Sequence, residues 1–136
     1  MDPLNTRVAA CHCGDLRVTM QGEPLMVSSC CCSHCQRRTG GFFGVTAYFH
    51  PDQMIAQEGA VATFQRPGST TLFHFCPRCG SNIWWGPFDD DQIIGLAGGA
   101  FVDPTLPSPE RMVFTKRRHP FVQPPAGVRQ YADGAD

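Results

Sequence analysis

Apolar and polar residues alternate along much of the chain, in short runs separated by turns that contain glycine or proline. In residues 15–20, Leu16, Val18 and Met20 alternate with polar side chains, which is the pattern of a strand with one buried face. Residues 42–49 are rich in aromatic and β-branched side chains, which favour strands. The same reasoning predicts strands at residues 25–29, 54–57, 60–66, 70–75, 81–85, 92–97 and 112–115.

Helical patterns are scarce in this sequence, and no segment has the period of a long amphipathic helix. A single helical turn is predicted near residues 33–38 or 107–111. Beyond His119-Pro120 the chain is turn-like, and residues 132–136 are expected to be frayed. Fourteen glycines and twelve prolines suit an all-β fold with few short helical turns. At 136 residues the chain is predicted to be one domain, residues 1–136, with a core at roughly 6–120 and a C-terminal tail at 121–136.

Charge and composition narrow the classes of function. The net charge is −1 and the isoelectric point is near 6.5, which argues against a nucleic-acid partner because nucleic-acid-binding domains are usually strongly basic. The N-terminus has no basic start followed by an apolar run, and no stretch has the length of a membrane span. These features predict a cytoplasmic protein. Thiols stay reduced there, so the eight cysteines are expected to bind metal rather than form disulfides.

Four of the eight cysteines lie within six residues, in the segment Cys30-Cys31-Cys32-Ser33-His34-Cys35. In an extended backbone Cys30 and Cys32 point to one side while Cys31 points to the other. A curl after Cys32 returns Cys35 to the same place. Three thiolates from one short segment leave one corner of a tetrahedron open, which is typical of a zinc site that can do chemistry.

The other cysteines form two pairs, Cys11-x-Cys13 and Cys76-x-x-Cys79. Together they supply four sulfurs, enough for a closed structural zinc site that links the N-terminus to the middle of the chain. In the rival partition Cys11 and Cys13 join the central cluster, which leaves Cys76 and Cys79 short of ligands. A redox dithiol is the alternative for the second pair, although no βαβ pattern accompanies it.

The residues around the central cluster suggest its chemistry. A small thiol that takes the open position would be held as a thiolate, its nucleophilic form. Arg37 and Arg38 could offset the negative charge of the sulfurs or bind a substrate carboxylate; an ordinary solvated face is the alternative. His34 is a candidate proton donor, or a side chain that hydrogen-bonds to a metal ligand. Cys31 is expected to be a small buried side chain.

These motifs resemble the glutathione-dependent formaldehyde-activating enzyme family, whose domain is also called the centromere protein V domain. The resemblance spans roughly residues 11–119 and rests on the following motifs: Cys11-x-Cys13-Gly14, Cys30-x-Cys32-x-x-Cys35 with Arg37, Arg38, Thr39 and Gly40, Phe75-Cys76-x-x-Cys79-Gly80, and the stretch 98–103. It implies a β-tent fold, in which several bent antiparallel sheets gather around zinc. It also implies a structural zinc on Cys11, Cys13, Cys76 and Cys79, and a catalytic zinc on Cys30, Cys32 and Cys35.

The activity that the resemblance implies is the condensation of glutathione with formaldehyde to S-(hydroxymethyl)glutathione, a carbon–sulfur lyase reaction in reverse. The expected partners are a glutathione-like thiol and an aldehyde. The alternative is a non-catalytic zinc-binding interaction module, in which His34, Cys31 or a partner completes the second site and basic residues contact a protein or nucleic acid.

Overall fold

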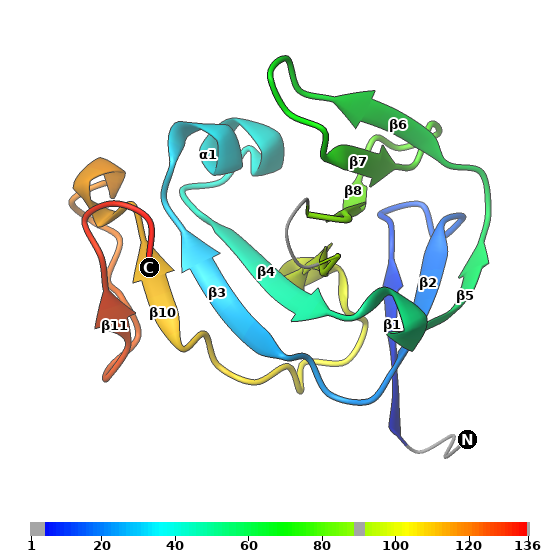
Figure 1. The fold of residues 1–136 in the computed structure, drawn as a ribbon, viewed down its shortest axis with the longest axis horizontal. Coiled ribbons are helices and arrows are strands. Elements are labelled where there is room, and N and C mark those ends of the chain that lie inside the picture. Colours follow the sequence, from blue (N-terminus) through cyan, green and yellow to red (C-terminus); the bar gives the residue numbers. More distant parts are fainter. Residues whose placement is uncertain (1–4, 89–91, 136) are drawn as a thin grey trace.

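The computed structural model describes residues 5–88 and 92–135, and the regular elements of this part of the chain are mainly short strands (Figure 1). The strands are β1 (Thr6–Ala10), β2 (Arg17–Gln21), β3 (Met26–Cys30), β4 (Gly44–Phe49), β5 (Met54–Glu58), β6 (Ala62–Gln65), β7 (Leu72–Phe75), β8 (Asn82–Gly86), β9 (Ile94–Ala97), β10 (Arg111–Val113) and β11 (Arg129–Gln130). The helical elements are α1 (Ser33–Thr39) and the short 3-10 turns η2 (Pro51–Gln53), η3 (Gly98–Ala100) and η4 (Thr115–Arg117). No helix in the described part is long and apolar enough to cross a bilayer.

Within the described residues the strands form two sheets. A small sheet has the order β1-β2-β5, and a large one has the order β11-β10-β3-β4-β9-β8-β7-β6. Pairing is antiparallel except that β10 runs parallel to both β3 and β11. Helix α1 follows β3 directly and lies at the end of the strands β3 and β4 (Figure 1). The expected all-β fold with few helical turns is therefore confirmed.

The two faces of the large sheet have different roles, because alternate residues of a strand point to opposite sides. Val27 of β3 and Ala47 and Phe49 of β4 are buried in the hydrophobic core, together with Val18 and Met20 of the small sheet. The residues between them, at positions 28, 30, 46 and 48, line a pocket instead. The core thus fixes one face of the strands β3 and β4 and turns their other face toward the cysteine cluster.

An irregularity in β8 places two side chains on the pocket side. His74 pairs with Trp84, but the next residue, Phe75, pairs with Asn82, so Ile83 is an extra residue in the ladder. A bulge of this kind re-aims the side chains around it. Asn82 and Trp85 consequently line the pockets beside α1, while Trp84 stacks against His74 with a centroid distance of 3.5 Å.

Several expectations about local structure are wrong. Of the two places predicted for a helical turn, the first forms α1 and residues 107–111 form none, whereas the 3-10 turns η2, η3 and η4 were not predicted. The strands β1 and β11 were not expected from the pattern. Residues 132 and 133 are not frayed, because the amides of Lys116 and Phe114 donate to the carbonyls of Ala132 and Asp133. Asp136 lies outside the described residues.

Gly59 joins β5 to β6 with a backbone φ of +93°, and a Cβ added there would lie 2.0 Å from the carbonyl oxygen of Asp15. We expect Gly59→Ala to lower the free energy of unfolding by about 3–5 kcal/mol, because backbone strain and a clash with main chain add together. Gly68→Ala is the matched control, with a similar φ of +82° and no atom within 4 Å of the added Cβ. The free energy of unfolding of Gly68→Ala should fall by only about 1 kcal/mol. Urea unfolding measures both, and equal losses would contradict the role of the contact with Asp15.

Candidate metal centres

Two turns bring the cysteine pairs together although 63 residues separate Cys13 from Cys76. The turn after β1 carries Cys11 and Cys13, and the turn between β7 and β8 carries Cys76 and Cys79. The four Sγ atoms lie within 4.8 Å of one another. The two turns are also joined by the amide of His12, which donates to the Ser81 hydroxyl at 3.0 Å.

The spacing of these sulfurs fits a tetrahedral metal site. The Cys11 and Cys13 sulfurs are 3.6 Å apart, and those of Cys13 and Cys76 are 3.7 Å apart. In a tetrahedral zinc site, bonds of about 2.3 Å place neighbouring sulfurs roughly 3.8 Å apart. Cys11 and Cys76 are buried, so part of the site is shielded from water. We call this group the four-cysteine site.

The second group, Cys30, Cys32 and Cys35, also has its three Sγ atoms within 4.8 Å of one another. Cys30 ends β3, and Cys32 is the N-cap of α1, where its sulfur accepts from the amide of Cys35 at 3.4 Å. The amide of Cys32 in turn lies 3.5 Å from the Cys30 sulfur. Amide donors of this kind favour the thiolate form. We call this group the three-cysteine site.

The pKa values of the thiols at the three-cysteine site depend on one another and on a neighbouring arginine. A hydrogen bond from Cys30 lowers the pKa of Cys35 to about 5, and Cys32 and the Arg38 guanidinium lower this pKa as well. The same interaction with Cys35 raises the pKa of Cys30. Gly44, paired with Cys30 across the sheet, leaves room for this contact, since a Cβ there would lie 3.0 Å from Arg38 Nη2 and 3.3 Å from Cys35 Cβ.

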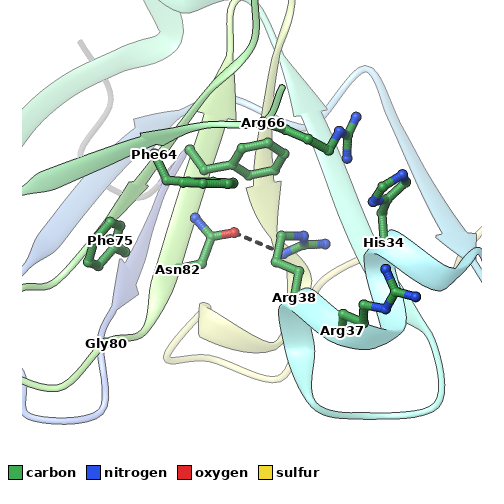
Figure 2. A pocket seen from close by; sticks show the side chains of 9 residues that line it. His34, Arg37, Arg38, Phe64, Arg66, Phe75, Gly80 and Asn82 are labelled. Carbon is green, nitrogen blue, oxygen red and sulfur yellow. Dashed lines mark hydrogen bonds between the residues drawn. The ribbon is translucent and has the colours of Figure 1, made fainter. Parts of the chain in front are cut away.

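Arg38 is held in place by two neighbours on β8. Its guanidinium lies 4.1 Å from the centroid of the Trp85 ring, and its Nη1 donates to Asn82 Oδ1 at 3.0 Å (Figure 2). A cation over a tryptophan face is among the stronger cation–π contacts. The arginine is therefore fixed between α1 and β8, with its charge beside Cys35.

The three-cysteine site opens into a pocket of about 750 Å³, which we call the cysteine pocket. Among the described residues that line it, five are basic and none is acidic: Arg38, Arg66, Arg111, Lys116 and Arg117. Lys116 is paired with Asp133. The surplus of positive charge favours anionic ligands, and carboxylates above all, because arginine binds them with two parallel hydrogen bonds.

A tyrosine and an arginine form part of the wall of this pocket. Arg111 Nε donates to the Ser28 hydroxyl at 3.0 Å, and the guanidinium is also hydrogen-bonded to Tyr48. Burial raises the pKa of Tyr48, and negative charge on Cys30 and Cys35 raises it further. Tyr48 therefore stays protonated at neutral pH and can donate a hydrogen bond into the pocket.

The remaining sequence candidates lie around this pocket but outside the sulfur groups. His34 is exposed in the first turn of α1 and lines the cysteine pocket, and Arg37 is exposed on the outer side of the same helix. Cys31 is completely buried and belongs to neither sulfur group among the described residues. The backbone of Cys31 is anchored, since its amide donates to Val113 and its carbonyl accepts from Gln36 Nε2.

Sequence reasoning missed Tyr48, Arg66, Arg111, Asn82 and Gly44. Tyr48 and Arg111 are 63 positions apart in the sequence and meet because β3 pairs with β4 on one side and with β10 on the other. No local motif marks either residue. The alternation of residues 44, 46 and 48 in a strand predicted to follow the cysteine segment was the one signal that could have placed Tyr48 on the pocket side.

Comparison with known proteins places this geometry in a family. The model of the family described as glutathione-dependent formaldehyde-activating enzyme matches residues 6–117. The fold is similar to the crystal structure of a protein from Rhodobacter sphaeroides, with a TM-score of 0.58 and 19% sequence identity, over 91% of this chain and 98% of that chain. No curated protein matches the chain. Because the family model covers most of the chain, including all eight cysteines, the protein belongs to the glutathione-dependent formaldehyde-activating enzyme family.

Proposed function

We propose that the protein adds a small anionic thiol, glutathione or a close relative, to formaldehyde and releases an S-(hydroxymethyl) thiol adduct. In the reverse direction this is a carbon–sulfur lyase reaction. The observation that carries the proposal is the three-cysteine site, whose sulfurs face a basic pocket large enough for a tripeptide-sized ligand. We place the reaction in the cytoplasm, where thiols stay reduced.

We further propose two zinc ions per chain. The four-cysteine site would hold one as a closed structural centre, since its sulfur spacing matches a tetrahedron. The three-cysteine site would hold the other with one position open, because neither Cys31 nor His34 joins that sulfur group in the described structure. When bound there, zinc would supply a Lewis-acid centre that favours the thiolate form of an incoming thiol.

The arginines of the pocket would select and orient the thiol. Arg38 stands beside Cys35 and is rigidly held by Asn82 and Trp85, so it can bind a carboxylate without reorganising. Arg111 reaches the pocket from β10 and could bind a second carboxylate, and Arg37 lines an adjoining hollow rather than this pocket. A dianionic or zwitterionic thiol would be recognised at several points at once.

Proton movement completes the reaction. The thiol loses its proton, its sulfur forms a bond to the carbonyl carbon, the C=O π bond breaks, and the oxygen takes up a proton. Tyr48 would give a hydrogen bond or a proton to that oxygen, since it faces the same pocket as Cys30 and Cys35 and stays neutral. His34 is the alternative donor, because it lines the same pocket and is exposed.

Magnetisation-exchange NMR of formaldehyde with glutathione tests the proposal. The zinc-loaded protein should accelerate adduct formation over buffer, and Tyr48→Phe should lower kcat about 100-fold while the KM for glutathione stays within about twofold. If His34→Gln loses this rate enhancement while Tyr48→Phe keeps it, the donor is His34 instead. An exchange rate equal to that in buffer would remove this pair of substrates.

A further inference from the structure

A second hollow of about 430 Å³ lies between α1 and the strands β6–β8 (Figure 2). Three phenylalanines and three arginines contribute to its lining: Phe64, Phe73, Phe75, Arg37, Arg38 and Arg66. We call it the arginine–phenylalanine groove. Its lining is mainly apolar; Arg37 and Arg38 enter it from α1, and Arg66 enters it from the end of β6 (Figure 2).

The groove adjoins the cysteine pocket rather than standing apart from it. His34, Arg38, Arg66 and Phe73 line both hollows. Formaldehyde is smaller than any one of these side chains and has no apolar body, so the addition of a thiol to formaldehyde leaves the groove without a use. A larger electrophile could occupy the groove and still present its carbonyl group at the three-cysteine site.

The groove has an aromatic floor. Phe73 lies between Phe64 and Trp85, with ring centroids 6.5 Å and 5.9 Å away. The Phe64 side chain is 54% exposed, so the residue leaves apolar surface uncovered in the groove. A flat apolar ligand would cover that surface and contact ring faces, which contributes beyond simple burial.

The positive charge of the groove favours an anionic ligand. Arg66 lies over the Phe73 ring at 5.8 Å from its centroid, and Arg38 lies over Trp85. None of the ion pairs among the described residues involves Arg37, Arg38 or Arg66. The guanidinium groups of Arg37 and Arg66 therefore remain available for a carboxylate from outside the chain.

We propose that this groove binds an aromatic aldehyde that carries a carboxylate, as a second electrophile for the same site. The inference rests on the proposed function. The ring would lie against Phe64 and Phe73, the carboxylate would meet Arg66 and Arg37, and the aldehyde would point past His34 and Arg38 toward Cys35. The thiol adds across the C=O bond as it does with formaldehyde: the S–C bond forms, the π bond breaks, and the thiol proton ends on oxygen. The product is a hemithioacetal, and no other reactant is consumed.

Binding without reaction tests the groove by itself. In isothermal titration calorimetry, the zinc-loaded protein should bind 4-(hydroxymethyl)benzoate, the unreactive alcohol that corresponds to 4-formylbenzoate. Phe64→Ala should weaken this binding about fivefold and Arg66→Gln at least about tenfold, from the typical contributions of a ring contact and a charged hydrogen bond. Phe121→Ala and Arg129→Gln are matched controls at exposed positions outside the groove, and they should leave the affinity unchanged.

Rate measurements distinguish a failure of this inference from a failure of the proposed function. With glutathione, kcat/KM for 4-formylbenzoate should exceed that for uncharged benzaldehyde at least about tenfold. If formaldehyde is converted but the benzoate alcohol does not bind, or binds equally well to Phe64→Ala and Arg66→Gln, the groove proposal is wrong and the proposed function stands. If the alcohol binds as expected and formaldehyde exchange is not accelerated, the binding site is supported and the proposed reaction fails.

Discussion

Replacing Cys76 with serine is expected to unfold the protein at room temperature. Cys76 is completely buried, and its sulfur lies 3.7 Å from that of Cys13 across two turns that no strand pairing joins directly. A structural zinc on four cysteines supplies about 10–16 kcal/mol of apparent binding energy, whereas small domains have a total stability of about 5–15 kcal/mol. A serine hydroxyl is a poor ligand for zinc, so most of that contribution is lost. Circular dichroism at increasing temperature should show no cooperative transition.

Cys31→Ala is the control for this change, since Cys31 is equally buried but outside both sulfur groups. It removes a small buried side chain and should cost only about 1 kcal/mol, or roughly 3–5 °C in melting temperature. A chelator strong enough to remove zinc should reproduce the effect of Cys76→Ser in the unmutated protein. If Cys76→Ser melts within a few degrees of Cys31→Ala, the two cysteine pairs do not share a structural ion.

The sequence was sufficient to predict the features that depend on residues close together in the chain. Alternation of apolar and polar residues predicted β2, and a high content of aromatic and β-branched residues predicted β4. The short spacing between cysteines predicted which of them lie together in one turn. The grouping of Cys11 and Cys13 with Cys76 and Cys79 followed from counting ligands, because four sulfurs close a tetrahedron. The structure places the same four together.

The features that were missed depend on contacts between distant parts of the chain. The segment of β1 has no clear alternation, and it is a strand because β2 pairs with it along its whole length. Likewise β11 has only two residues and exists through its parallel pairing with β10. Propensity has little influence where a neighbouring strand supplies the hydrogen bonds.

The residues that line the cysteine pocket could not be predicted from the sequence for the same reason. Which side chains of β8 face Arg38 depends on the bulge at Ile83, and the role of Arg111 depends on the register that pairs it with Ser28. A shift of one residue in either strand would send these side chains to the other face. The grouping of the cysteines could therefore be predicted from their spacing, while the side chains that line the pocket beside them could not.

Replacing Cys32 with serine should abolish thiol addition and leave the fold intact. Cys32 is the N-cap of α1, and serine is a better N-cap than cysteine because its hydroxyl accepts from the same amide, that of Cys35. The variant therefore keeps the local hydrogen bond and removes one of three sulfur ligands. We expect zinc to fall from about two ions per chain to about one, since two cysteines alone do not complete a site. Metal analysis by mass spectrometry measures this directly.

The rate of thiol addition should fall when the three-cysteine site loses its metal ion. Formaldehyde exchange with glutathione should fall to the level of buffer in Cys32→Ser, while the melting temperature stays within a few degrees of the parent because the four-cysteine site and the core are untouched. Cys31→Ala, one residue away, should keep both zinc ions and the parent rate, which separates the loss of a ligand from a disturbance of the segment. A Cys32→Ser protein that binds a single zinc and still accelerates the exchange would show that the reaction does not depend on the three-cysteine site, and the assignment of the reaction to this site would then have to be abandoned.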